Sequence, residues 1–261
     1  MGCYANPVRS LFAAAVLAAA ILASPPRLDA SEPAIKPWCA PEVVELSFHV
    51  CYFDGAPTDG GRRTLVLYLH GMLATTPGFQ YVQQRALARE AKARGFTVLF
   101  PTSPRVDYGY YWPTSGASQK EQEPAVLAGI AQARASLTER LGRPFDETFV
   151  VGFSSGAYYA SSLAVRSAID VDGYIVLAGG SSWARPADAK AKRAPVFVGV
   201  SASDRQTASH ARSFAGTLAA LHWPYRVEER DVGHLVDDVF LAHGLAWLRA
   251  RKRASAADGG P

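Results

Sequence analysis

The sequence has 261 residues, of which 49% are hydrophobic and 19% charged, and this length and composition favour one folded domain with a sizeable core. The formal net charge is +4, with arginines scattered along the chain. The one dense basic run, at residues 249–253, is next to the C-terminus and is typical of a solvated helix end or tail. Because neither a basic stripe nor an aromatic stacking module accompanies this run, we expect no nucleic-acid partner.

Residues 1–30 have the pattern of a secretory signal peptide. Arg9 precedes an unbroken apolar run from Leu11 to Ala23, which is shorter than the ~20 apolar residues that a membrane span needs. Small residues and prolines follow the run, and Ala30 marks a second candidate cleavage position. We therefore expect a secreted or periplasmic protein whose mature chain has no stable membrane span.

The mature chain would keep two cysteines, Cys39 and Cys51, because Cys3 lies within the predicted signal peptide. In an oxidising compartment, Cys39 and Cys51 can close a small disulfide loop. The alternative is two unrelated buried thiols, because the spacing of two cysteines does not fix the distance between their Cα atoms. We expect the disulfide.

A proline-rich linker at residues 31–42 is expected before a domain at residues 43–253, and a disordered tail at residues 254–261 after it. Within the domain, apolar runs of strand and helix character alternate. The predicted strands cover residues 43–53, 64–69, 96–100, 148–151, 174–178, 196–200 and 225–229, and the predicted helices cover residues 79–94, 126–141, 156–166, 209–221 and 239–249.

This alternation predicts the α/β fold class, with a doubly wound, mostly parallel sheet and helices on both faces. The segment between residues 178 and 196 is long enough for a helical turn but not for a large cap domain, so we expect an open cleft. Ligands of such sheets bind beyond the carboxyl ends of the strands. Reactive side chains are therefore expected just after the predicted strands.

The strongest signal is Gly152-Phe153-Ser154-Ser155-Gly156, between a predicted strand and a predicted helix. A G-x-S-x-G sequence in that position is typical of a nucleophile elbow, whose central serine occupies a strained turn. The N-terminal end of the helix dipole would favour both activation of the serine and a nearby oxyanion. The alternative is a glycine-rich turn that merely contains serine. We identify Ser154 as the candidate nucleophile.

A serine hydroxyl at neutral pH needs a base, which a third group must orient. Among the six histidines, His234 follows the last predicted strand and precedes a helix, in a loop where a base should lie. The other candidates fall in or beside predicted strands and helices, at His49, His210, His222 and His243. We identify His234 as the candidate base.

The acid should fall between the serine and the histidine in chain order. Asp204 follows the carboxyl end of the predicted strand at residues 196–200, so we identify it as the candidate acid. A helix N-cap is the alternative role for an aspartate in this position. Asp188 is the competing acid, whereas the aspartates within four residues of His234 are expected on the surface of its loop.

An oxyanion hole would complete the site. In this architecture, one backbone N–H comes from the loop after the first central strand, and the other comes from the residue after the nucleophile. We therefore expect the N–H groups of Met72 and Ser155 to be the donors, with Leu73 as an alternative to Met72. His70, in the same loop, is expected to brace it rather than to transfer protons.

Aromatic residues are concentrated in the loop at residues 107–113, which follows a predicted strand and should therefore face the cleft. We expect Tyr110, Tyr111 and Trp112, together with Trp183, to contact an acyl chain or a ring of the substrate. The alternative is that these aromatic side chains only cover the end of the sheet.

Together these pieces resemble the α/β-hydrolase superfamily, and the resemblance covers residues 43–249. It is carried, in the family's order, by Leu69-His70-Gly71, Gly152-x-Ser154-x-Gly156, Gly199-x-x-x-x-Asp204 and Gly233-His234. Within the superfamily the chain is most similar to small secreted esterases of the polyhydroxybutyrate-depolymerase and feruloyl-esterase type. This resemblance implies a serine hydrolase that cleaves small-molecule or polymeric carboxylic esters through an acyl-enzyme.

Two alternatives to ester hydrolysis remain open from the sequence. The same triad can cleave an amide, peptide or thioester, and a hydrolase scaffold can also serve as a non-catalytic binding protein. No metal or organic cofactor is expected, because the sequence contains no glycine-rich phosphate loop and no histidines at metal-ligand spacing. The sequence carries no prediction of the oligomeric state.

Overall fold

The computed structural model describes residues 37–55, 57, 61–74, 78–181 and 192–258, with side chains described as far as residue 254. The predicted signal peptide and most of the predicted linker lie outside these residues. Among the described helices, none combines the length and the apolar character required to cross a bilayer.

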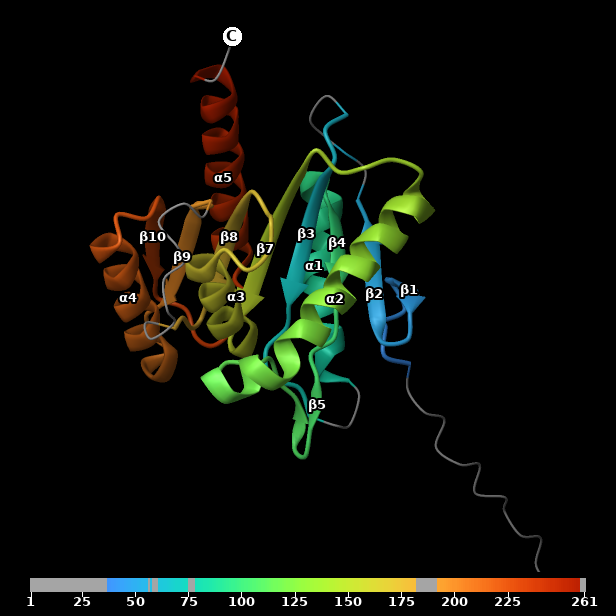
Figure 1. Ribbon diagram of the computed structural model, residues 1–261, viewed down its shortest axis with the longest axis horizontal. Coiled ribbons are helices and arrows are strands. Elements are labelled where there is room, and N and C mark those ends of the chain that lie inside the picture. The colour runs from blue at the N-terminus through green and yellow to red at the C-terminus, as the bar shows by residue number, and fades with distance from the viewer. Residues whose placement is uncertain (1–36, 56, 58–60, 75–77, 182–191, 259–261) are drawn as a thin grey trace, which may run out of the picture. The chain divides into compact units, whose positions relative to one another are not determined.

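An eight-stranded sheet with the order β1-β2-β4-β3-β7-β8-β9-β10 forms the centre of the domain (Figure 1). Its strands are β1 (Val44–Ser47), β2 (Val50–Asp54), β3 (Thr64–Leu69), β4 (Thr97–Phe100), β7 (Glu147–Phe153), β8 (Gly173–Leu177), β9 (Val196–Ser201) and β10 (Tyr225–Arg230). Neighbouring strands from β4 to β10 pair in parallel, and β1 and β2 pair antiparallel. The predicted mostly parallel sheet is confirmed, and the parallel strands bring their carboxyl ends to one edge.

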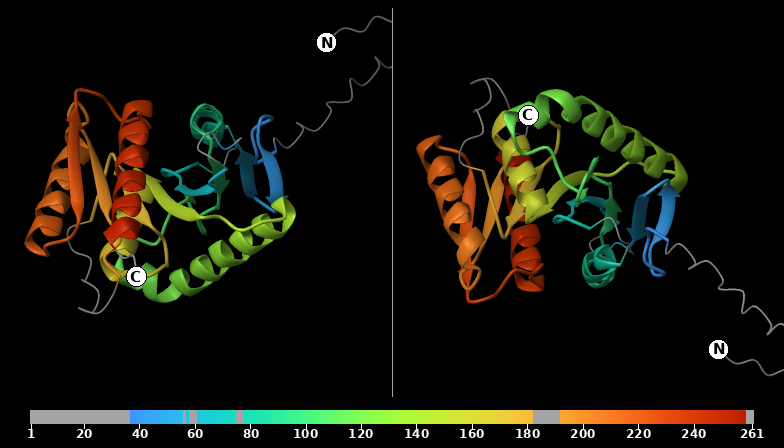
Figure 2. Two further views of the ribbon diagram at one scale, coloured as in Figure 1. Left: turned by 90° about the horizontal axis from the view of Figure 1, so that it is seen from above. Right: turned by 90° about the horizontal axis from the view of Figure 1, so that it is seen from below.

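Helices cover both faces of the sheet (Figure 2). One face packs against α1 (Phe79–Arg94) and α5 (Asp238–Asp258), and the other against α2 (Gly116–Leu141), α3 (Ser155–Arg166) and α4 (Arg205–Ala220). Along β3, Leu65, Leu67 and Leu69 pack into the α2–α3–α4 core, whereas Val66 and Tyr68 pack into the α1–α5 core. A strand buried on both faces is expected to be a nearly continuous apolar run, as β3 is after Thr64.

The segment at residues 43–53 forms two strands and not the single strand that we predicted. β1 and β2 are an antiparallel pair joined by a tight turn at Phe48 and His49. His49 has a φ of 60°, in the left-handed region that glycine or asparagine usually occupies in such turns. The prediction was wrong because neither residue is one that normally signals a turn.

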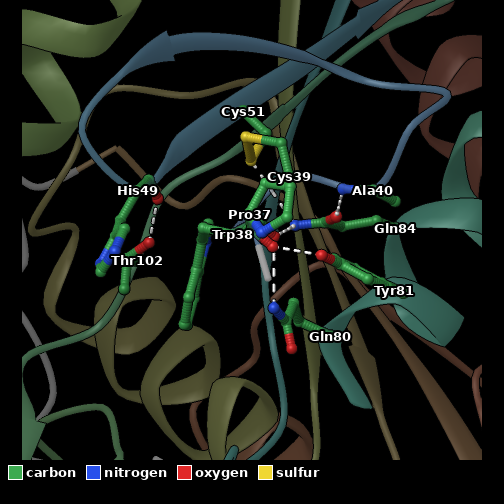
Figure 3. Close-up of a disulfide and its surroundings, with 10 residues drawn as sticks. All are labelled: Pro37, Trp38, Cys39, Ala40, His49, Cys51, Gln80, Tyr81, Gln84 and Thr102. Atoms are coloured by element: carbon green, nitrogen blue, oxygen red, sulfur yellow. Dashed lines mark hydrogen bonds between the residues drawn. A yellow bond between two sulfur atoms is a disulfide. The ribbon is translucent and has the colours of Figure 1, made fainter. Parts of the chain in front are cut away.

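The predicted disulfide between Cys39 and Cys51 is present. Figure 3 shows that side chains of α1 hold the same segment of chain. Gln84 accepts a hydrogen bond from the Ala40 N–H at 2.7 Å and donates one to the Trp38 carbonyl at 3.3 Å. The segment before β1 is therefore fixed to the sheet by a covalent bond and to α1 by hydrogen bonds.

Helix α2 begins ten residues before the position where apolar spacing predicted it, at residue 116 instead of residue 126. Ser115 caps it, because the Ser115 side chain accepts a hydrogen bond from the Ser118 N–H at 3.1 Å. Pro124 lies inside the helix, and a proline normally indicates a helix boundary. The early turns were missed for that reason.

Helix α5 continues to Asp258, through residues that we expected to begin a disordered tail. Its basic run also has a structural role. The Arg249 side chain donates a hydrogen bond to Glu147 at 3.0 Å and one to the Thr64 hydroxyl at 2.8 Å. Glu147 is fully buried, so this guanidinium stabilises a carboxylate that burial would otherwise destabilise.

The chain between β8 and β9 spans residues 178–195, which is too short for a large cap domain. A small hairpin, formed by β5 (Arg105–Val106) and β6 (Gly109–Tyr110), carries the predicted aromatic loop. In Figure 1 this hairpin lies at the end of the sheet to which the arrowheads of β3 and β7 point. The loops that carry the candidate site therefore surround the carboxyl edge of the sheet.

Candidate active site

Ser154 occupies the sharp turn between β7 and α3. Its φ of 51° and ψ of −117° lie outside the regions that L-residues favour, so the backbone is strained at this position. The two flanking glycines are required by close backbone contacts. A Cβ at Gly152 would lie 2.3 Å from the Gly156 carbonyl oxygen, and one at Gly156 would lie 2.0 Å from that of Leu69. This is the geometry of a nucleophile elbow.

A chain of hydrogen bonds connects the three side chains that the sequence singled out. His234 Nε2 lies 3.0 Å from Ser154 Oγ, and His234 Nδ1 lies 2.6 Å from Asp204 Oδ2. Because an ionised carboxylate can only accept, Nδ1 donates to Asp204, and Nε2 is left to accept the hydroxyl proton of Ser154. Residues separated by up to 80 positions in the sequence thus meet at one edge of the sheet.

The Asp204 carboxylate is held in its ionised form. Burial of this side chain, which is 10% exposed, raises its pKa, but hydrogen bonds from Thr207 and His234 outweigh the effect and lower the pKa below its ordinary value. The Thr207 hydroxyl donates to Oδ2, and Asp204 also caps α4 by accepting from the Thr207 N–H. The two roles considered for Asp204, N-cap and partner of the base, are therefore compatible.

The competing histidines and aspartates have other partners. His210 contacts the Tyr158 hydroxyl, and His243 contacts Glu228. Around the base, Asp231, Asp237 and Asp238 interact with Ser203, Arg230 and Arg89. Asp188 lies outside the described residues. Within the part of the chain that the structure describes, no group of three or more His, Cys, Asp or Glu side chains could hold a metal ion.

The backbone N–H groups of the loop after β3 differ in their hydrogen-bond partners. The Leu73 N–H donates to the Tyr110 carbonyl at 3.2 Å, and the Gly71 N–H donates to Gln83 Oε1 at 3.1 Å. Leu73, the alternative to Met72, is thus already engaged, whereas the N–H groups of Met72 and Ser155 have no acceptor among the described residues, and their role as oxyanion donors stays a prediction.

His70 braces this loop from inside, as expected. Its Nδ1 lies 2.6 Å from the Gly71 carbonyl, and its Nε2 accepts the Ser103 N–H at 3.2 Å. Burial lowers the pKa of His70 to about 4, against a smaller opposite effect of the Gly71 hydrogen bond. A neutral imidazole that makes both hydrogen bonds serves as a structural tie and not as a proton carrier near pH 7.

One further residue, Gln83 on α1, was not predicted from the sequence. Its Oε1 accepts from both the Gly71 N–H and the Tyr68 hydroxyl, at 3.1 Å and 2.7 Å. The side chain is buried, and its Nε2 has no partner among the described residues. Gln83 therefore orients the His70–Gly71 peptide, which lies one peptide before the one that carries the Met72 N–H. A glutamine in the middle of a helix carries no pattern that would reveal this contact.

The prediction that Trp112 contacts the substrate is not supported by the structure, in which Trp112 has no exposed surface. Its ring stacks on Tyr159 with centroids 5.5 Å apart, and its indole N–H donates to the His70 carbonyl at 2.9 Å. Its backbone N–H donates to Ser155 Oγ at 3.4 Å. Trp112 supports both the loop after β3 and the elbow from the core.

Tyr110 and Tyr111 are half-buried beside Trp112. The ring of Tyr110 packs against Trp38 with centroids 4.7 Å apart, and that of Tyr111 lies near the exposed Tyr108. Trp183 lies outside the described residues. Contact of Tyr110, Tyr111 and Trp183 with substrate stays a prediction.

Comparison with known proteins supports the fold by structure alone. No protein-family model and no curated protein sequence matches the chain. A carboxylesterase of Bacillus cereus is similar, with a TM-score of 0.55 and 15% identity over 77% of this chain and 94% of that one. YahD, solved with malic acid, gives a TM-score of 0.52 and 17% identity over 77% and 98% of the two chains. SOBER1 of Arabidopsis thaliana gives 0.51 and 17% identity over 72% and 99%.

The similarity covers 94–99% of each of these solved structures. The chain has the α/β-hydrolase fold. At 15–17% identity the similarity concerns the arrangement of strands and helices. What the site does must be argued from its own geometry.

Proposed function

We propose that the protein is a serine hydrolase that cleaves carboxylic esters through an acyl-enzyme. The observation that carries this proposal is the hydrogen-bonded series Ser154, His234 and Asp204 beside the two unpartnered N–H groups of Met72 and Ser155. A nucleophile, a base, an orienting acid and an oxyanion hole are the parts that acyl transfer needs.

In the first half of the proposed reaction, Ser154 Oγ attacks the ester carbonyl carbon while its proton passes to His234 Nε2. Negative charge then develops on the carbonyl oxygen, where the N–H groups of Met72 and Ser155 stabilise it. One such donor typically contributes about 10²–10³-fold in rate. When the tetrahedral intermediate collapses, the alcohol oxygen leaves with the proton from His234, and the acyl group stays on Ser154.

Water completes the cycle. His234 Nε2 takes a proton from water, the hydroxide oxygen attacks the acyl carbon, and the same N–H groups hold the second oxyanion. Ser154 then leaves as the alcohol and recovers its proton from His234, releasing the carboxylic acid. Asp204 keeps the imidazole in one tautomer throughout and stabilises the imidazolium that forms in each half.

One consideration favours esters over the other acyl compounds. The similar structures include an esterase by name, the carboxylesterase of B. cereus, and this supports ester hydrolysis as the first activity to test. Amide, peptide and thioester cleavage use the same machinery, and they remain the alternative. A purely binding role is disfavoured, because such a role would not require the strained φ of Ser154.

We further propose that the enzyme acts outside the cytoplasm, as secreted esterases of the depolymerase and feruloyl-esterase type do. The Cys39–Cys51 disulfide supports this compartment, because disulfides persist where the environment is oxidising. The predicted signal peptide at residues 1–30 is the segment that would direct export.

A fluorophosphonate probe tests the mechanism, because it labels a serine only when an adjacent base activates it. We expect the mature protein to be labelled and Ser154→Ala to be unlabelled and inactive on a panel of esters. Ser213→Ala, a substitution at an exposed serine of α4, is the matched control and should label like the wild type. Labelling that persists in Ser154→Ala would show that another residue is the nucleophile.

A further inference from the structure

An apolar groove opens beside His234, between α1 and the loop that follows the base. Its apolar lining comes from Phe79, Val82 and Ala86 of α1, Phe153 at the end of β7, and Leu235 and Val236 of the loop. The groove encloses about 540 Å³, which lies in the range of small-molecule sites. His234 itself is part of the lining, so the groove is continuous with the candidate active site.

Three large apolar side chains of this groove are exposed. Val82 is 63% exposed, Phe79 59% and Leu235 47%. Large apolar side chains that gather at one exposed place indicate a binding site. No described side chain covers these three, so an apolar ligand would remove their surface from water.

The groove follows the axis of α1. Phe79, Val82, Ala86 and Arg89 are spaced three, four and three residues apart, so they share one face of the helix. At 1.5 Å per residue, this row extends along about 15 Å, which suits an elongated ligand. Arg89 at its end forms an ion pair with Asp238, with 3.8 Å between the charged groups.

The charged groups around the groove limit what can bind. The lining holds the carboxylates of Asp237 and Asp238 and the guanidinium of Arg89. Asp238 pairs with Arg89, and Asp237 pairs with Arg230, so the described lining offers a negatively charged ligand no unpaired arginine or lysine side chain. An uncharged apolar chain fits both the lining and the charge.

We propose that this groove binds the alcohol portion of the substrate, and that the enzyme prefers esters of apolar, elongated alcohols. The proposal rests on the proposed function. In that mechanism His234 Nε2 donates its proton to the leaving oxygen, so the leaving alcohol must lie against the imidazole. The groove begins at that imidazole, and the ring of Phe153 at its inner end lies 4.9 Å from that of His234.

Two series of esters separate the alcohol side from the acyl side. The first is methyl, butyl and octyl acetate, and the second is methyl acetate, butanoate and octanoate. We expect kcat/KM of the wild type to rise about two- to fourfold for each methylene added to the alcohol, as burial of apolar surface predicts. Val82→Asn and Leu235→Asn should lose most of that rise and keep their dependence on acyl length.

Matched controls make the result specific. Val227→Asn places the same substitution at a 40% exposed valine on β10 and should behave like the wild type in both series. Val227→Asn should also hydrolyse methyl acetate within about twofold of the wild type, since substitutions at exposed positions away from the site have small effects on the fold. For the two groove variants, the quantity compared is the ratio of kcat/KM for octyl acetate to that for methyl acetate within each variant. This shared substrate also shows whether each variant is folded and active.

The outcomes distinguish the groove from the mechanism. Ser154-dependent hydrolysis with no dependence on alcohol length overturns the assignment of the groove alone. The same is true if Val82→Asn and Leu235→Asn alter the acyl series instead. If no ester is hydrolysed, or if hydrolysis persists in Ser154→Ala, the proposed function fails, and the groove proposal fails with it.

Discussion

Leu73 and Tyr110 exchange two backbone hydrogen bonds, the Leu73 N–H to the Tyr110 carbonyl at 3.2 Å and the Tyr110 N–H to the Leu73 carbonyl at 2.8 Å. This bridge joins the loop after β3, which carries Met72 and is called the predicted oxyanion loop below, to the hairpin formed by β5 and β6. The bridge anchors the loop directly after Met72, since the Leu73 N–H belongs to the Met72–Leu73 peptide. The aromatic hairpin therefore contributes to the site through its backbone.

The first prediction follows from Gly109, which makes this bridge possible. Gly109 has a φ of 151°, and a Cβ at this position would lie 2.0 Å from the Leu73 carbonyl oxygen. We expect Gly109→Ala to displace the predicted oxyanion loop and to lower kcat on esters about 10²-fold, near the value of one lost donor. Gly116→Ala, where a Cβ would meet nothing within 4 Å, should retain activity. Equal kcat in the two variants would contradict this role of the bridge.

A second prediction concerns Gln83. Gln83→Leu removes the acceptor of the Gly71 N–H, and we expect kcat to fall at least about tenfold with little change in KM, because the oxyanion is bound mainly in the transition state. Gln80→Leu is the control, since Gln80 is a buried glutamine of the same helix that bonds Gly78 and Trp38 instead. Each variant should lose about 1–3 kcal/mol of stability. Steady-state kinetics beside urea unfolding would separate the two effects, and an unchanged kcat in Gln83→Leu would refute the positioning role.

The third prediction concerns pH and stability. Burial holds the folded-state pKa of His70 at about 4, below the ordinary value of 6.5, so the unfolded chain binds a proton there more readily between these two pH values. The His70 contribution should therefore be complete above about pH 6.5 and lost as the pH falls to about 4, a change of about 3 kcal/mol. Urea unfolding of the wild type and His70→Asn from pH 7.5 to 4.5 would measure it. If both proteins lose stability in parallel, His70 is not the group responsible.

A fourth prediction concerns the disulfide. Reduction of Cys39–Cys51, which are separated by 12 residues in sequence, should destabilise the fold by about 3 kcal/mol in the chain-entropy description. The double variant Cys39→Ser/Cys51→Ser should show the same loss without reductant. Thermal unfolding with and without dithiothreitol would measure the difference. If the double variant also responds to dithiothreitol, the effect of the reductant does not arise from this bond.

Much of this site could be predicted from local sequence because its parts lie where strands end. The glycines around Ser154 indicate a turn that only small residues permit, and Asp204 and His234 each follow a predicted strand. Parallel strands bring those ends to one edge of a sheet, so residues distant in sequence could be expected to meet. The predicted oxyanion donors follow from the same rule.

The remainder depends on packing, which leaves no local pattern. Trp112 was expected in the cleft because an aromatic residue in a loop is equally compatible with a ligand contact and with a core position. The turn at His49 was missed because a non-glycine residue adopts a left-handed conformation there. The hydrogen bond between Gln83 and Gly71 depends on how α1 packs against the sheet. The packing angle of a helix cannot be predicted from the sequence of that helix alone.

The strained turn at Ser154 also bears on how stable the protein can become. A non-glycine residue held at such φ and ψ values costs about 1–3 kcal/mol, and glycine would adopt them with little penalty. Ser154→Gly is therefore expected to stabilise the fold, and that variant has no nucleophile. If Ser154 acts as we propose, selection for thermostability alone would eliminate the activity, and the serine persists only where its chemistry is used.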